Sequence, residues 1–228
     1  MDWRLTNTCV YCGGYADTRD HVPSKCFLDE PYPDNLSVVP CCSKCNNMFS
    51  KDEEYVSCLI DCINESVDNP LKVSRLKTRK ALEHSTKLAE VIKSEIIPLE
   101  NGIKYTYNKQ RFEQVMFKLA YGHLAYENST LSFDSKYQVR IDLLKQFDAH
   151  TLSVFEEPYF SVLLPEVGSR SLSKIGVFLI QEGYNGFKCC SNWQGIQNGR
   201  YRYCVAPESN RIKIVIAECL AIEVIIFD

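Results

Sequence analysis

The chain has 228 residues, of which 45% are apolar and 24% carry a charge, so it can bury a core and is not a disordered polypeptide. Its formal net charge of −3 argues against a protein that simply coats nucleic acid. It contains no run of about 18 apolar residues, so we expect no membrane span.

The cysteine content indicates a reducing compartment. Twelve cysteines occur in a chain whose first residues lack the apolar segment of a secretory signal. In such a chain, thiols are expected to bind metal or to pack in the core rather than to form disulfides. We therefore expect a cytoplasmic protein.

The first part of the chain is predicted to be short strands followed by a helix. Residues 1–50 are rich in Gly and Pro and show little helical periodicity. Extended pieces are expected at Arg19–Val22 and Leu36–Val39. From about Asn46 the pattern becomes helical, because apolar residues recur at spacings of three and four. They are Tyr55, Leu59, Cys62 and Ile63.

The middle of the chain is predicted to be mainly helical. Residues 71–97 carry an apolar stripe among Lys, Arg and Glu, which indicates one or two helices. Asn101-Gly102 lies between two apolar segments and predicts a hairpin. A further helix is expected at about Lys109–Glu127, and a shorter one at Ser135–Ala149.

After about Thr151 the apolar runs become short and rich in alternating or β-branched residues, with Gly and Asn between them. This pattern predicts an antiparallel sheet of about five strands. The expected strands are Tyr159–Leu164, Ile175–Gln181, Tyr201–Val205, Ile212–Ala217 and Ala221–Phe227.

These elements predict an α+β fold with three segments. They are a head (residues 1–66), a mainly helical segment with a short hairpin (67–150) and an antiparallel β domain (151–228). Charge divides unevenly along the chain, since residues 1–70 hold five Lys and Arg against 12 Asp and Glu, whereas residues 71–145 hold 14 against eight. An acidic head suits a divalent metal and a basic helical segment suits a phosphate backbone, although either can be an ordinary solvated surface.

Two cysteine pairs in the head have metal-ligand spacing. Cys9-x-x-Cys12 and Cys42-x-x-Cys45 are separated by 29 residues. Each pair can place two sulfurs on one knuckle, so together they can form a complete tetrahedral Zn²⁺ site. Cys41 is adjacent to the second pair and is a possible competitor, but the two-residue gap favours Cys42.

Four thiolates would close the zinc shell, so catalytic residues must lie elsewhere. His21, between the two pairs, is the leading candidate, because a neutral imidazole can take a proton from an attacking water. Asp20 precedes it, but successive side chains on a strand point to opposite faces. Asp20 would therefore need a twisted backbone to act at the same place.

The order Cys-x-x-Cys, Asp-His-x-x-Pro, Asn-Leu and Cys-x-x-Cys-Asn resembles the zinc-stapled HNH endonucleases over residues 9 to about 54. The resemblance implies a ββα-metal unit, in which His21 is the general base. It implies that Asp20 and Asn46 bind a catalytic Mg²⁺ or Mn²⁺, and that Asn35 orients the loop and supports the histidine.

The match has departures from the family pattern. Phe49 stands where the family often has Lys, and the run Ser50–Glu54 is unusually acidic. A carboxylate of this run could join the metal or could simply favour a helix N-terminus. Asn47 is a close rival to Asn46 as a metal ligand.

The sequence therefore predicts a metal-dependent endonuclease that hydrolyses DNA, most simply double-stranded DNA, with one catalytic cation. The densest basic cluster is expected to contact the substrate backbone, and it comprises Arg75, Lys77, Arg79 and Lys80. A role in restriction or phage defence, a homodimer and an activating protein partner are further expectations from the resemblance. Two alternatives remain open, a non-catalytic zinc-stabilised nucleic-acid-binding module and a nuclease subunit that is silent without its partner.

Overall fold

A ββα unit opens the part of the chain described by the computed structural model, which covers residues 7–65, 71–99, 102–129, 136–161, 170, 175–179, 187–207 and 209–227. Strand β1 (Thr18–Val22) pairs antiparallel with β2 (Ser37–Cys41), and His21 lies opposite Val38. A 3-10 turn, η2 (Lys25–Phe27), follows β1. Both strands predicted here are confirmed.

Helix α1 (Ser43–Glu65) follows β2 and includes the helix that was expected from about Asn46. It starts three residues earlier than expected, inside the second cysteine knuckle. Its second half is buried on nearly every side, because it lies among the strands and the other helices rather than on the surface. The apolar residues that this half buries are Tyr55, Val56, Cys58, Leu59, Ile60, Cys62 and Ile63.

The middle segment contains three helices and a hairpin. Helices α2 (Leu76–His84) and α3 (Thr86–Glu95) meet at Ser85, whose side chain caps α3 by accepting a hydrogen bond from Leu88 N–H. Strands β3 (Ile96–Leu99) and β4 (Gly102–Tyr105) form the predicted hairpin. Residues 100–101, at its turn, lie outside the described residues.

Helix α4 (Lys109–Asn128) confirms the helix expected at Lys109–Glu127. The side chain of Asn108 accepts a hydrogen bond from Arg111 N–H and caps its first turn. The chain leaves the helix at Ser129, which adopts a left-handed conformation with φ of 57°.

The helix predicted at Ser135–Ala149 is wrong. From residue 136 the chain forms a strand, β5 (Lys136–Leu143), followed by a 3-10 turn, η3 (Leu144–Gln146). The physical reason is a period of two: Val139, Ile141 and Leu143 alternate with polar residues and all pack against the core. A short helix, α5 (Ala149–Glu156), comes afterwards.

The C-terminal strands form two sheets rather than one. The larger is an antiparallel five-stranded sheet in the order β5-β12-β11-β10-β9. Its remaining strands are β9 (Gln194–Gln197), β10 (Tyr201–Val205), β11 (Arg211–Ile216) and β12 (Leu220–Phe227). The smaller has the order β6-β8-β7 and comprises β6 (Phe160–Ser161), β7 (Ile175–Leu179) and β8 (Phe187–Ser191).

Three of the expected strands are confirmed as β10, β11 and β12, and a fourth as β7. Of the expected strand Tyr159–Leu164, only Phe160 and Ser161 form a strand, the two-residue β6, and residues 162–164 and 180–181 lie outside the described residues. Strands β5, β8 and β9 were not predicted.

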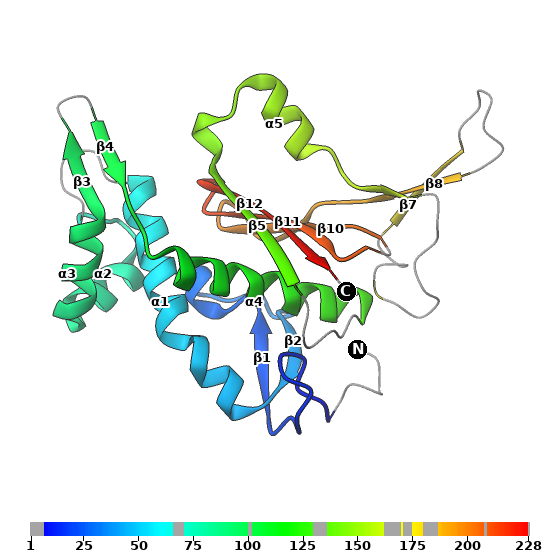
Figure 1. The fold of residues 1–228 in the computed structure, drawn as a ribbon, viewed down its shortest axis with the longest axis horizontal. Helices are drawn as coiled ribbons and strands as arrows, with labels where there is room; N and C mark the ends of the chain where they lie inside the picture. Colours follow the sequence, from blue (N-terminus) through cyan, green and yellow to red (C-terminus); the bar gives the residue numbers. More distant parts are fainter. Residues whose placement is uncertain are drawn as a thin grey trace.

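Helix α4 lies between the ββα unit and the five-stranded sheet, as Figure 1 shows. One hydrophobic cluster runs through all three layers. It includes Val22 from β1, Leu59 from α1, Met116 from α4 and Ile222 from β12. The three segments expected from the sequence therefore share a common core.

Gly122 allows α4 to approach the end of β1 closely. A Cβ atom at this position would lie 3.0 Å from a methyl carbon of Val22 and 3.1 Å from the hydroxyl of Tyr11. The backbone of the helix can therefore pack directly against the side chain of Val22, on the strand that carries His21. Among the described residues, no helix is long and apolar enough to cross a membrane.

Candidate metal centre and adjoining cleft

The four predicted metal ligands come together. The sulfur atoms of Cys9, Cys12, Cys42 and Cys45 all lie within 4.8 Å of one another, and those of Cys12 and Cys42 are 3.8 Å apart. A tetrahedral zinc ion with Zn–S bonds of about 2.3 Å would hold its sulfurs about 3.8 Å apart. The cluster could therefore hold a metal ion such as zinc.

The backbone shapes both knuckles. Gly13, with φ of 72°, donates its N–H to Cys9 O at 2.9 Å and turns the first knuckle. In the second, the N–H of Cys45 points at the sulfur of Cys42 across 3.4 Å. The thiol of Cys41 instead donates to Cys42 O at 3.2 Å, so the competing cysteine stays outside the cluster.

Electrostatics in the first knuckle favour a thiolate. Burial acts to raise the pKa of Cys9, but backbone hydrogen bonds from Cys42, Tyr11 and Cys12 lower this pKa to about 7. A deprotonated sulfur is the form that binds a metal. The backbone thus favours the thiolate form at Cys9, whereas burial raises the pKa of the Cys45 thiol.

His21 opens onto a cleft that the four cysteines do not line. The cleft has a volume of about 410 Å³ and lies between β1, η2, α1 and α2. His21 is half-buried on its wall. Burial lowers the pKa of the imidazole, and the charges of Lys25 and Lys118 lower it further against the opposing effect of Asp20. A neutral imidazole at pH 7 is the form that can accept a proton.

Asp20 points the other way, into the protein. The residue is 6% exposed, and its Oδ2 atom accepts a hydrogen bond of 2.8 Å from the hydroxyl of Tyr11. The same oxygen lies 2.7 Å from the ammonium of Lys118, which comes from α4. The side chains of Asp20 and His21 therefore point to opposite faces of the strand, as expected for successive residues, although both reach the wall of the cleft.

Lys118 joins Asp20 to a second carboxylate. Its ammonium also contacts Glu53 of α1 and donates to the hydroxyl of Ser24 at 2.8 Å. Ser24 in turn donates to Glu53 at 2.5 Å. Burial alone would lower the pKa of Lys118, but the charges of Glu53 and Asp20 outweigh burial and raise it. Lys118 is therefore held as a buried ammonium.

The structure does not bring the two predicted asparagines to the cleft wall. Asn35 is exposed in the turn before β2, and the amide of Asn46 donates to the hydroxyl of Thr18 at 3.4 Å. Within the described ranges, the four-cysteine cluster is the only group of three or more His, Cys, Asp or Glu ligands close enough to share an ion. Asp20 and Asn46 are thus held by other partners.

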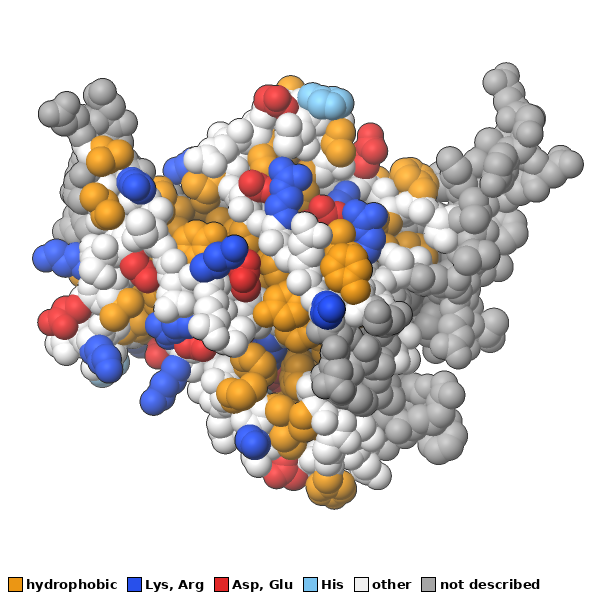
Figure 2. All heavy atoms as spheres, viewed as in Figure 1, with side chains coloured by type: hydrophobic (Ala, Val, Ile, Leu, Met, Phe, Trp, Pro, Cys, Tyr) orange, Lys and Arg blue, Asp and Glu red, His pale blue; other side chains and the backbone are white. Residues whose placement is uncertain are grey.

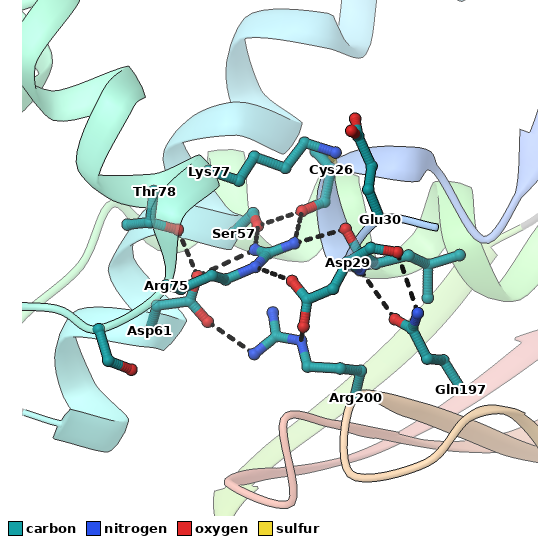
Figure 3. Close-up of polar contacts among 12 residues, drawn as sticks. Cys26, Asp29, Glu30, Ser57, Asp61, Arg75, Lys77, Thr78, Gln197 and Arg200 are labelled. Atoms are coloured by element: carbon teal, nitrogen blue, oxygen red, sulfur yellow. Dashed lines mark hydrogen bonds and ion pairs between the residues drawn. The ribbon is translucent and has the colours of Figure 1, made fainter. Parts of the chain in front are cut away.

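Arg75 has a structural role rather than the predicted contact with a substrate. Its side chain is buried, and the guanidinium donates to Asp29, to Asp61, to the hydroxyl of Ser57 and to two backbone carbonyl groups (Figure 3). Those carbonyls belong to Cys26 and Leu28. With its N–H groups directed into the protein, Arg75 cannot also clamp a phosphate.

The other three predicted basic residues differ among themselves. Lys77 lines the cleft, but its ammonium donates to Lys25 O at 2.6 Å and to the hydroxyl of Tyr32 at 2.8 Å. Arg79 and Lys80 are exposed on α2 and do not line the cleft. On the face drawn in Figure 2, the Lys and Arg side chains stand singly or in small groups among acidic and hydrophobic ones.

The cleft is tied to the C-terminal sheet by contacts that sequence reasoning missed. Gln197, at the end of β9, accepts from Asp29 N–H at 2.8 Å and donates to Asp29 O at 3.0 Å. Arg200 donates to Asp61 at 2.9 Å (Figure 3). The segment behind His21 is therefore anchored to residues about 170 positions later, a pairing with no local sequence signal.

Comparisons of this chain with protein-family models, with curated proteins and with solved structures found no match. The geometry of the site and the motif order are therefore what bear on its function.

Proposed function

We propose that the chain is an HNH-type endonuclease that hydrolyses DNA, with zinc bound by the four cysteines as a structural ion and His21 as the general base. The observation that carries this proposal is the position of His21. A half-buried imidazole with a lowered pKa lies on the wall of a cleft, on the strand that follows the first of the two cysteine knuckles. The motif order of the HNH endonucleases supports the same assignment.

The proposed chemistry is hydrolysis of a phosphodiester. His21 takes a proton from water, the water oxygen bonds to phosphorus, and the bond from phosphorus to the leaving oxygen breaks. The leaving oxygen takes a proton from solvent water, and His21 returns its proton to solvent. Lys25 and Lys51 also line the cleft, where their charges can offset the charge on the phosphate. The zinc site has no open position in this scheme, and it holds the knuckles in place.

The divalent cation implied by the resemblance does not fit its expected ligands. Oδ2 of Asp20 already contacts Lys118 and Tyr11, and Asn46 contacts Thr18. The proposed steps therefore use the chain's own groups. The second candidate function is a zinc-stabilised nucleic-acid-binding module without cleavage activity, and the ion pair that occupies Asp20 favours it.

The test is cleavage of supercoiled plasmid by the purified, zinc-loaded chain, with Mg²⁺, with Mn²⁺ and with a chelator of weakly bound divalent ions. His21→Ala should lose cleavage by at least about 100-fold, as expected for removal of a general base. His84→Ala, at an exposed histidine of α2, is the matched control and should retain activity.

Equal cleavage by the wild type and His21→Ala would refute the assignment of the base. Absence of cleavage by the zinc-loaded wild type in all three conditions, with DNA still bound, would favour the binding module.

A further inference from the structure

The most unusual group near the cleft is the ammonium of Lys118. The side chain is 1% exposed, yet it carries its charge into the space between β1 and α1. It extends from α4, which belongs to a different layer of the fold. The proposed cleavage chemistry gives this lysine no role.

The ammonium contacts the two buried carboxylates from one position. It lies 2.7 Å from Asp20 Oδ2 and forms an ion pair with Glu53 Oε1. The rings of Tyr11 and Phe49 flank it, with centroids at 5.8 Å and 5.9 Å from Nζ. Lys118 is thus enclosed by anionic oxygens and aromatic faces, both of which favour a cation.

A divalent cation would need the same space. Mg²⁺ binds oxygen at about 2.1 Å in a nearly ideal octahedron and keeps several waters. An ion shared by Asp20 and Glu53 would therefore coincide with the ammonium and its first contacts. The carboxylate pair can hold Lys118 or a divalent ion, but not both.

We infer that Lys118 is the resident cation of this site, and that it excludes divalent ions from Asp20 and Glu53 while it fixes the backbone on either side of His21. Asp20 and Ser24, both partners of the ammonium, lie just before and shortly after His21 in the chain. Lys118 is a positioning residue, since it is too buried to contact a substrate.

The inference concerns the cleft of the proposed nuclease, but it rests on the ion pairs themselves. Asp20 and Glu53 carry two negative charges against one positive charge on Lys118. Without the ammonium, two buried carboxylates would face each other uncompensated. Such a pair should take up a divalent ion from solution.

The experiment titrates Mn²⁺ into the zinc-loaded full chain and follows the free ion by electron paramagnetic resonance. Wild type and Glu53→Gln should bind Mn²⁺ alike, because Lys118 occupies the carboxylate pair in the wild type and Glu53→Gln lacks one of the two carboxylates. Lys118→Met should gain a site at least tenfold tighter than any in the wild type. The gain should disappear in Lys118→Met with Glu53→Gln, and Lys118→Arg, which keeps the charge, should not show it.

Two results would overturn the inference. One is Mn²⁺ binding by the wild type that Glu53→Gln or Asp20→Asn abolishes. The other is a folded, zinc-bound Lys118→Met chain that gains no site. If Lys118→Met fails to fold, the comparison of wild type with Glu53→Gln still decides. Because binding is read without cleavage, a failed nuclease assay leaves this test intact.

Discussion

Replacement of Arg75 by methionine should lower the free energy of unfolding by about 3 kcal/mol, the lower part of the range for breaking a buried ion pair by removing one partner. The reason lies in Asp61, whose side chain is 1% exposed and accepts a hydrogen bond of 2.9 Å from Arg75. Methionine keeps an unbranched apolar stem but offers no N–H group, so the buried carboxylate loses one of its cations.

The size of this loss in unfolding free energy depends on the partners that Asp61 keeps. Asp61 keeps Arg200 at 2.9 Å and the hydroxyl of Thr78, so the carboxylate is not stripped of all its partners. The side chain of Asp29 is 43% exposed and can be solvated by water, so loss of its ion pair with Arg75 adds little to the change in unfolding free energy. For a chain of this size, about 3 kcal/mol corresponds to a fall in Tm of about 6–12 °C.

The assay is urea unfolding followed by tryptophan fluorescence, with Arg79→Met as the matched control. Arg79 lies on α2, the helix that Arg75 precedes, and is exposed, so its replacement should change the unfolding free energy by less than about 0.5 kcal/mol. Asp61→Asn in the Arg75→Met background removes the charge left behind, so the double variant should be more stable than the sum of the single effects predicts. A loss below about 1 kcal/mol for Arg75→Met, or strict additivity, would refute the structural role.

Three other predictions concern the metal ligands, the pKa of His21 and the hydrogen bonds between Gln197 and Asp29. Cys42→Ser should lose bound zinc in metal analysis whereas Cys41→Ser keeps it, and equal loss in both would contradict the ligand assignment. The pKa of His21 in an NMR titration should lie below the ordinary 6.5, and it should rise in Lys25→Met, which removes a charge that lowers it. In the wild type, this lowered pKa contributes stability that is fully present above pH 6.5 and is lost as the pH falls through the pKa of the folded chain. Gln197→Ala should destabilise the chain by about 1–3 kcal/mol in urea unfolding, because the N–H and carbonyl groups of Asp29 lose their partner; no change would show that water replaces the amide.

Features coded by neighbouring residues could be predicted from the sequence. The two cysteine pairs, the hairpin at Asn101-Gly102 and helix α4 depend on local spacing, and each occurs where it was expected. Strand β5 carried its own signal as well, an alternation at Val139, Ile141 and Leu143, which is the period of a strand and not of the helix that was expected there.

Buried charges could not be predicted, because their partners lie far away in the sequence. Lys118 is 65 residues from Glu53, and Arg75 is 46 residues from Asp29. A dense run of Lys and Arg usually means a solvated surface, and that holds for Arg79 and Lys80. The depth of Arg75 depends on tertiary packing that no local pattern describes.

The order of the five-stranded sheet also constrains how this protein can be made. Strand β12 lies between β5 and β11, so β5 pairs with a strand that a ribosome adds about 80 residues later. Until those residues emerge, β5 has no partner among the described strands on either edge, and the hydrophobic cluster that includes Val22 and Met116 lacks Ile222 and its neighbours. Chains interrupted before residue 220 should therefore be substrates for chaperones and proteases rather than folded proteins with a weakened site.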